Sequence, residues 1–297
     1  MNKFIQIFKN EISSGNKYSE LTISSYINDI ELFFEYLYKN SILMDQVDAI
    51  VIRNYVCDEL ENKKSKRTVK RHMTALRKFY NCMKKVGYVQ INPFIAARTP
   101  KADIKLPHFV DDDQMMTLIE ANKLRKDPLA IRDQAILELL YFSGIRAAEL
   151  VNLKIQDVDL NRNIMKIFGK GRKQRNVPFT SNCQKTLKKY LKDCRPILFA
   201  KCKKNPSPSF FLNSYGNRLT NRGLEYILNQ IQEKTGIDLG LTPHVIRHSY
   251  ATNLLTRGAP LMTVKELLGH ESISTTEIYT HVDNAQLKEA HEKYFKK

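Results

Sequence analysis

Two histidines and an arginine share one face of a predicted helix in the last fifth of the chain. The segment PHVIRH follows Thr242, a good N-cap, and places Pro243 at the first helical position, where no backbone N–H is needed. His244, Arg247 and His248 then occupy positions i, i+3 and i+4. Such a face suits metal coordination through imidazoles or anion binding near a helix N-terminus.

A zinc site is the less favoured interpretation of this face. The spacing matches zinc helices of the type H-E-x-x-H, but Val245 stands where the glutamate base belongs. Arg247 would also place a permanent positive charge beside a divalent cation. We therefore predict an anion site without metal or cofactor, and a solvated basic helix face is the alternative.

Four other segments carry side chains that can bind or attack a phosphate. SGIRAAEL places Arg146 after a helix-ending glycine, and FGKGRK places Lys170 in a predicted hairpin turn. LLGHES places His270 after another such glycine, and TTEIYTH places Tyr279 on a short helix capped by Ser274. Arginine presents a planar, always charged fork to phosphate oxygens, so two arginines can clamp one phosphodiester. Tyrosine, with an ordinary pKa of about 10, needs a base and positive surroundings to become a nucleophile.

This ordered set resembles the signature of the tyrosine recombinases, the phage integrase family, and within it the cellular Xer recombinases. That signature contains an arginine in G-[IL]-R-x-x-E-L, a hairpin lysine, H-x-x-R, G-H and a nucleophilic tyrosine. The one small departure is Ala148, where serine or threonine is more usual. The roles implied by the resemblance are phosphate binding by Arg146, Arg247 and His270, proton transfer by His244, general acid catalysis by Lys170 and nucleophilic attack by Tyr279. The implied product is a 3′-phosphotyrosyl bond with a free 5′-hydroxyl, formed without metal or ATP.

Two of these assignments have simple structural alternatives. Arg146 lies three residues before Glu149 and would otherwise only form an ion pair with it. Glu149 itself is expected to orient the site and not to transfer protons. Lys170 competes with Arg172 and Lys173 of the same turn.

Other aromatic and imidazole side chains compete for the remaining roles. Tyr250 and Tyr294 are alternatives to Tyr279, although only Tyr279 follows the LGH segment on a capped helix. His270 would otherwise act as a helix cap. His248 is expected to support the site without a catalytic role.

Charge and cysteine content limit the class of protein. The chain of 297 residues has 48 Lys and Arg against 31 Asp and Glu, a formal net charge of +17, which favours nucleic acid over a membrane surface as partner. The 5 cysteines are odd in number and lack a C-x-x-C pair, as expected for free thiols in a reducing cytosol. No apolar run is long enough for a signal peptide or a membrane span. We expect a cytoplasmic protein without membrane association.

The first third of the chain is predicted to be helical, with one strongly basic helix. Helices are expected from Ser19 over SELTISSYINDIELFFEYLYKN, over MDQVDAIVIRNYVCDELEN, and over KRTVKRHMTALRKFYNCMKKVG to Gly87. No acidic residue occurs from Asn62 to Ala102. The third helix has an apolar stripe formed by Val69, Met73, Leu76, Phe79, Tyr80 and Met83. Its opposite face would lie along a phosphate backbone. The candidate DNA contacts on that face are Lys66, Arg67, Lys70, Arg71 and Arg77.

The sequence predicts two domains and a mainly α fold. The resemblance implies that residues 1–98 form an all-helical, SAM-like core-binding domain that binds DNA, followed by a linker at 99–108. It also implies that residues 109–297 form a mixed α+β catalytic domain with a C-terminal tail at 284–297. The only β pattern, DVDLNRNIMKIFGKGRKQRNVPF, predicts a small three-stranded antiparallel sheet. Gly144 and Gly258 are each predicted to end a helix, Gly258 in the left-handed conformation.

The resemblance implies a site-specific recombinase acting on double-stranded DNA as a homo- or hetero-tetramer with cyclic exchange of the tail. About eighteen residues precede the first predicted helix, too few for the arm-binding domain of many phage integrases. This favours an Xer recombinase that resolves chromosome or plasmid dimers before cell division, with a second Xer recombinase and the FtsK translocase as partners. The alternatives are an integrase of a phage or mobile element, a non-catalytic DNA-binding protein of the same fold, and a metallohydrolase using His244 and His248.

Overall fold

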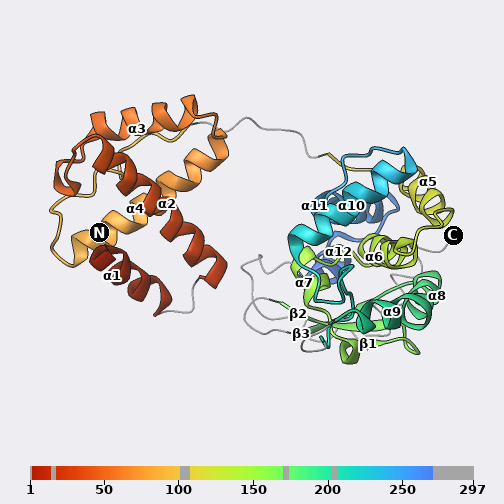
Figure 1. Ribbon diagram of the computed structural model, residues 1–297. Coiled ribbons are helices and arrows are strands. Elements are labelled where there is room, and N and C mark those ends of the chain that lie inside the picture. Colours follow the sequence, from red (N-terminus) through yellow and green to blue (C-terminus); the bar gives the residue numbers. More distant parts are fainter. Residues whose placement is uncertain (1, 15–17, 101–107, 170–173, 203–206, 270–297) are drawn as a thin grey trace. The chain divides into compact units, whose positions relative to one another are not determined.

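The chain forms two compact units, Met1–Leu106 and Pro107–Lys297. The computed structural model describes residues 2–14, 18–100, 108–169, 174–202 and 207–269 (Figure 1). In these residues the first unit contains helices only, whereas the second combines helices with one three-stranded antiparallel sheet. The predicted fold class is therefore confirmed.

The first unit is built on four helices, of which α4 packs against the other three. They are α1 (Asn2–Ser13), α2 (Glu20–Lys39), α3 (Ala49–Glu61) and α4 (Lys66–Lys85), with a 3-10 turn, η1 (Met44–Gln46), before α3. Ser19 caps α2 as predicted, because its hydroxyl accepts a hydrogen bond from the Thr22 N–H at 3.2 Å. The expectation that the first helix begins near residue 19 was wrong. Ile5, Phe8 and Ile12 repeat at helical spacing and bury one face of α1.

Aromatic side chains form the core between these helices. Phe33 of α2 lies edge-to-face against Tyr55 of α3, with ring centroids 4.9 Å apart, and against Phe94 at 5.6 Å. Phe79 of α4 makes the same type of contact with Phe8 of α1 at 5.6 Å. This geometry aligns the positive ring edge with the negative face of the neighbouring ring. Because Phe94 is fully buried, the segment after α4 also belongs to this core.

The two predicted faces of α4 are present, with one exception among the basic residues. Every member of the apolar stripe is buried. Of the five candidate DNA contacts, four are exposed: Lys66, Arg67, Lys70 and Arg71. Arg77 differs, because its Nε donates to the carbonyl of Phe94 at 2.8 Å and its Nη2 to that of Ala97 at 3.4 Å. Its guanidinium therefore fastens the segment after α4 to the helix.

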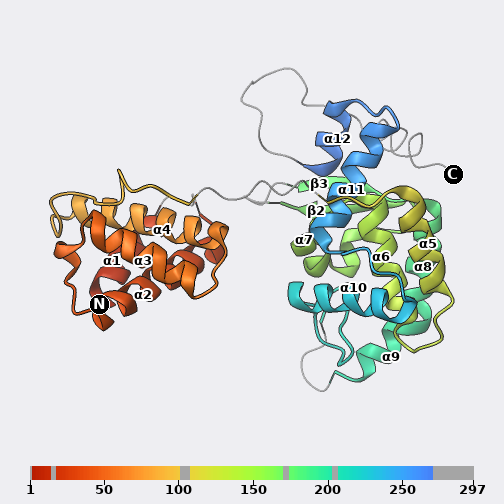
Figure 2. The ribbon, with the colours of Figure 1, turned by 90° about the horizontal axis from the view of Figure 1, so that it is seen from above.

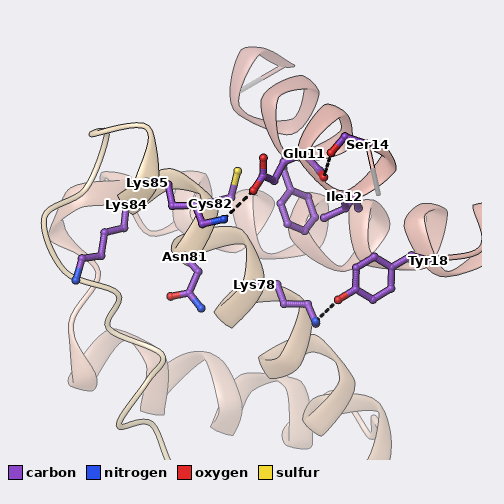
Figure 3. A pocket seen from close by; sticks show the side chains of 10 residues that line it. Glu11, Ile12, Ser14, Tyr18, Lys78, Asn81, Cys82, Lys84 and Lys85 are labelled. Atoms are coloured by element: carbon purple, nitrogen blue, oxygen red, sulfur yellow. Dashed lines mark hydrogen bonds and ion pairs between the residues drawn. The ribbon is translucent and has the colours of Figure 1, made fainter. Parts of the chain in front are cut away.

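A pocket of about 710 Å³ lies between α1 and α4 (Figure 3). Lys78 of α4 donates to the Tyr18 hydroxyl, and its Nζ lies 4.8 Å from the centre of that ring. Lys85 lies 2.9 Å from a carboxylate oxygen of Glu11 on α1. The basic face of α4 thus continues beyond Arg77 to the end of the helix.

A cluster of buried charges joins α2, α3 and α4. His72 Nδ1 lies 2.7 Å from Glu59 Oε2, and His72 Nε2 lies 3.4 Å from Asp29 Oδ1. Arg71 and Lys64 reach the same two carboxylates from the surface, each with an N–O distance of 2.9 Å. Burial raises the pKa of Asp29 to about 6 although Arg71 opposes this, and burial lowers the pKa of His72.

The second unit is organised around helix α6, in which twelve of fourteen residues are buried. The helix contacts α5, α8, α10 and α11, which surround it in Figures 1 and 2. The elements before the sheet are α5 (Asp112–Lys123), α6 (Ala130–Ser143), α7 (Ala147–Asn152) and the 3-10 turn η2 (Ile155–Asp157). The helices after the sheet are α8 (Ser181–Lys189), the π-helical η4 (Tyr190–Cys194), α9 (Arg195–Ala200), α10 (Asn221–Thr235), α11 (Pro243–Thr256) and α12 (Leu261–Leu268).

The sheet has the strand order β1 (Val158–Asp159), β2 (Ile164–Phe168), β3 (Gln174–Pro178). Phe168 pairs with Gln174, so residues 169–173 connect β2 to β3, as the turn prediction required. The predicted left-handed conformation of Gly258 is present, with φ of 84°, and Gly144 also has a left-handed φ of 61°. The sheet and the glycine-ended helices together set the positions of the side chains described below.

We predict that replacing Asp29 with asparagine changes how the first unit responds to pH. The folded-state pKa of about 6 exceeds the ordinary 3.8, so the carboxyl group destabilises the fold increasingly as pH rises from about 4 to about 6. His72 acts in the opposite direction, since a lowered histidine pKa makes stability rise as pH approaches its ordinary value. From pH 4.5 to 7.5, Asp29→Asn should gain about 2 kcal/mol in unfolding free energy relative to wild type.

Urea-dependent hydrogen exchange of α2 and α4 peptides in the full chain measures this difference. Asp45→Asn, in the exposed η1 turn, is the matched control and should follow wild type. A wild-type protein that gains stability over this range relative to Asp29→Asn would contradict the prediction.

Candidate active site

Two arginines that are 101 positions apart in sequence donate to the carbonyls of consecutive residues. Arg146 is the N-cap residue of α7, and its Nη2 donates to the Gly269 carbonyl at 3.0 Å. Arg247, in the second turn of α11, donates through Nη2 to the Leu268 carbonyl at 2.7 Å and through Nη1 to the Gly144 carbonyl. Adjacent acceptors hold the two guanidiniums next to each other.

The acceptors for these arginines are carbonyls at the C-termini of two helices. Gly144 is the C-cap of α6, Leu268 is the last residue of α12 and Gly269 is its C-cap. Carbonyls at such ends lack intrahelical donors and carry partial negative charge. They therefore stabilise Arg247, which is only 8% exposed. Burial, together with the charge of Arg146, lowers the pKa of Arg247 to about 10, so the guanidinium stays charged at neutral pH.

Glu149 is the carboxylate of this cluster. Its Oε2 accepts the backbone N–H of Arg146 at 2.8 Å, and its Oε1 accepts Arg146 Nη1 at 3.0 Å. Arg175 donates from both terminal nitrogens, at 2.8 Å each, one to each carboxylate oxygen. Burial acts to raise the pKa of Glu149, but the hydrogen bonds from Arg175 and Arg146 outweigh it and hold this pKa below its ordinary value. The ion pair considered as an alternative for Arg146 is thus present, and 42% of the Arg146 side chain is still exposed.

Arg175 was missed in the sequence analysis. It lies on β3, two residues before Val177, and Val177 is 1% exposed. Alternate residues of a strand share a face, so the alternation directs Arg175 toward the interior. An arginine directed inward must find a counter-ion. That alternation, in the segment QRNVP, is the signal that identifies the residue.

A close approach at Gly269 brings α12 against Arg175. A Cβ atom at Gly269 would lie 2.9 Å from Arg175 Nε, and the residue has φ of 64°. Both the space and the left-handed backbone therefore require glycine. Figures 1 and 2 show α7, α12 and β3 close together at this point.

Some of the other predicted site residues lie within the described part of the chain, and the rest lie outside it. His244 is exposed at the start of α11, one turn before Arg247, and His248 is partly buried on the same helix. Tyr250 is fully buried against Gly144, which argues against it as a nucleophile for a DNA duplex. The predicted residues Lys170, His270 and Tyr279, the alternatives Arg172, Lys173 and Tyr294, and the tail at 284–297 lie outside the described residues.

The described part of the chain has neither a metal-binding cluster nor a membrane-spanning helix. Within those ranges, no group of three or more His, Cys, Asp or Glu side chains is arranged to hold a metal ion. No helix among the same residues is both long enough and apolar enough to cross a membrane.

Comparison with known families decides the affiliation of the chain. Residues 108–286 match the phage integrase family, and residues 5–87 match the phage integrase N-terminal SAM-like domain. The chain is a tyrosine recombinase of the phage integrase family. This recombinase is 40% identical over 293 residues to the tyrosine recombinase XerC of Oceanobacillus iheyensis, covering 98% of this chain and 93% of the relative. It is 36% identical over 299 residues to XerC of Bacillus subtilis, covering 99% and 98% of the two chains. The resemblance inferred from the sequence is confirmed.

Solved structures show that the recombinase shares its fold with proteins of low sequence identity. A XerH site-specific recombinase bound to a difH substrate has a TM-score of 0.67 at 22% identity, covering 85% of this chain and 74% of that one. A lambda integrase dimer bound to a core site has a TM-score of 0.67 at 15% identity, covering 92% and 75%. These similarities support the fold alone.

We predict that Gly144→Ala destabilises the second unit more than Gly236→Ala. Both glycines end a helix with positive φ, 61° and 71°, so each substitution carries a backbone cost of about 1–2 kcal/mol. A Cβ at Gly144 would lie 2.4 Å from a ring carbon of the buried Tyr250, whereas nothing lies within 4 Å at Gly236. Overpacking should add about 1–3 kcal/mol at Gly144 only. Urea unfolding followed by hydrogen exchange in α6, α10 and α11 measures both costs, and equal costs would refute the packing argument.

Proposed function

We propose that this recombinase cuts and rejoins DNA strands through a 3′-phosphotyrosyl intermediate formed by Tyr279. The observation that carries the proposal is the convergence of Arg146 and Arg247 on the carbonyls of Leu268 and Gly269. Two charged forks held side by side form an arrangement that suits the two non-bridging oxygens of one phosphodiester.

The arginines would act mainly in the transition state. Attack on phosphorus builds negative charge on the non-bridging oxygens, and preorganised donors stabilise that charge without further reorganisation. Each arginine could contribute about 2.7–4 kcal/mol to lowering the barrier, the range for comparable donors. Arg146 is the more exposed of the two, and Arg247 is fixed by two carbonyls. We therefore propose that Arg146 contacts the phosphate first and that Arg247, whose position is fixed, binds the phosphate as a rigid second donor.

The remaining catalytic roles are assigned by position along the chain. Lys170 lies in the 169–173 connection, and Arg175 at the start of β3 is bonded to Glu149 beside Arg146. Lys170 is assigned the role of general acid. His270 directly follows Gly269, so it is assigned to the phosphate, and His244 is assigned to proton transfer.

The nucleophile is within reach of the arginines along the chain. Tyr279 follows His270 by nine residues, and nine residues of extended chain span up to about 30 Å. Its attack would pass the phenolic proton to His244, form the O–P bond and release the 5′-oxygen, which takes a proton from Lys170. The phosphotyrosyl bond conserves the energy of the broken strand for rejoining.

We further propose that the recombinase resolves chromosome or plasmid dimers in the cytoplasm before cell division. Support comes from XerC relatives that match 98–99% of the chain. A tetramer on DNA with exchange of the 284–297 tail, a second Xer recombinase and the FtsK translocase belong to this proposal. The shared fold with lambda integrase does not separate this role from integration, whereas the near-complete match to XerC favours it.

The first unit is proposed to hold DNA along the basic face of α4. The exposed side chains of Lys66, Arg67 and Lys70 support this assignment, and the 1–98 region would form the core-binding domain. Arg71 is exposed, but its guanidinium forms an ion pair with Asp29. Arg77 is already bonded to two carbonyls and is proposed to act chiefly in folding.

We predict that Tyr279→Phe abolishes the covalent complex with a suicide-nicked duplex while DNA binding persists. The substitution keeps the ring and removes the attacking oxygen. The substrates are nicked duplexes selected for binding from genomic fragments of the source organism. The full chain is incubated with them in the presence of EDTA, and the products are separated on a denaturing gel. A covalent complex formed by Tyr279→Phe, or a wild-type reaction that needs added metal, would overturn the proposal.

Lys70→Ala and Arg77→Ala should differ in their effects. Lys70→Ala should weaken DNA binding and reduce the dependence of log Kd on log salt by about 1. Arg77→Ala should instead lower the unfolding free energy of the first unit by about 1.5–3 kcal/mol, because it removes charged hydrogen bonds to carbonyls. Binding isotherms at several salt concentrations and urea unfolding separate the two effects. An unchanged salt slope for Lys70→Ala would remove this residue from the DNA contacts.

A further inference from the structure

One buried carboxylate is shared unequally between two guanidiniums. The Glu149 side chain is 5% exposed and accepts hydrogen bonds on both oxygens. Arg175 occupies it in bidentate fashion, with both distances at 2.8 Å. Arg146 offers a single side-chain bond to the same carboxylate, at 3.0 Å. Bidentate, charge-assisted pairs are the stronger kind, so Arg175 is the principal counter-ion of Glu149.

This division leaves donors of Arg146 available for a ligand. A guanidinium has five N–H groups, and the structure assigns one of those of Arg146 to Glu149 and one to the Gly269 carbonyl. The other three have no hydrogen-bond partner among the described residues. The Arg146 side chain is 42% exposed, against 19% for Arg175. The less exposed arginine, Arg175, is therefore committed to Glu149, and Arg146 keeps three of its five side-chain donors.

Packing gives a second, independent constraint on Arg175. Its Nε, Cδ and Cζ atoms would all lie within 3.0 Å of a Cβ at Gly269. The guanidinium thus fills the space beside the residue whose carbonyl binds Arg146. Loss of Arg175 would leave both the carboxylate and this carbonyl segment without their neighbour.

We propose that Arg175 is a positioning residue for strand cleavage, which neutralises Glu149 and thereby keeps the Arg146 guanidinium free for the scissile phosphate. The inference rests on the proposed function, since it assigns Arg146 to that phosphate. Without Arg175, the buried carboxylate would have Arg146 as its remaining bonded cation. Arg146 would then turn to a bidentate pair with Glu149, and its charge and donors would be lost to the substrate.

The test is a double-mutant cycle in the full chain on the selected nicked duplex. Arg175→Gln should slow covalent-complex formation by roughly 10- to 100-fold, the range found for residues that orient catalytic groups at metal sites. DNA affinity should stay close to that of wild type, because Arg175 does not contact the substrate. Glu149→Gln keeps an oxygen for the Arg146 backbone N–H but no longer neutralises a guanidinium. The double variant should therefore react faster than Arg175→Gln alone.

Two further variants separate positioning from general effects. Arg175→Lys keeps the charge without the planar fork and should give an intermediate rate. Arg162→Gln removes one positive charge from an exposed ion pair on the β1–β2 turn and should match wild type. Urea unfolding of all variants shows whether Arg175→Gln is folded. If it is not, the rate of covalent-complex formation by Arg175→Lys is compared with that of wild type instead.

The outcomes distinguish the failure of this inference from failure of the proposed function. If wild type forms no Tyr279-dependent covalent complex, the proposed function itself is wrong. If wild type reacts and Arg175→Gln reacts equally fast, Arg175 is not a positioning residue. If adding Glu149→Gln deepens the defect of Arg175→Gln, release of Arg146 from Glu149 is not the mechanism.

Discussion

The second unit depends on holding several positive charges together in a partly buried place. Two unit charges 4 Å apart repel by about 4 kcal/mol at an effective dielectric constant of 20. A cluster of Arg146, Arg175 and Arg247 needs compensation before any ligand arrives. One carboxylate, Glu149, and the carbonyls at the ends of α6 and α12 supply it. The helix ends in turn gain donors for carbonyls that their own helices leave unbonded.

This mutual compensation explains why two glycines occur where they do. Gly144 ends α6 tightly enough for Arg146 to begin α7 and for its own carbonyl to meet Arg247. Gly269 ends α12 where the Arg175 side chain occupies the space a Cβ would need. The turns are thus fixed by the arginines as much as by the helices they end. In this region, the backbone conformation of the two turns and the positions of the arginines depend on each other.

The sequence predicted well what local chemistry controls and poorly what requires knowledge of burial. The caps at Ser19 and Thr242 and the three-stranded sheet follow from short-range preferences, and they are present. Helix α1 was not predicted, although Ile5 and Phe8 carry the periodic signal, because its start in the sequence has no Ser, Thr or Asp as a cap. Arg77 looked like its basic neighbours, and only its hydrogen bonds to carbonyls 17 and 20 residues further along the chain distinguish it.

Within the site, the sequence gives candidates whereas the three-dimensional structure gives their partners. The motif around Arg146 and Arg247 could be found from residue types, because arginine pairs suit phosphate chemistry. Arg175 could not be recognised from its type alone, since the hairpin holds several basic residues of similar appearance. Its distinction lies in a bidentate contact with Glu149 across 26 positions of sequence.

The backbone carbonyls that anchor Arg146 and Arg247 have a consequence for how the protein tolerates sequence change. Every residue carries a carbonyl, so the acceptor at Leu268 survives substitution of the leucine side chain as long as the chain keeps its path. Side-chain acceptors such as Glu149 have no such freedom. Evolution can therefore vary the packing of α12 while the two arginines keep their acceptors, and selection falls on the shape of the turn at Gly269.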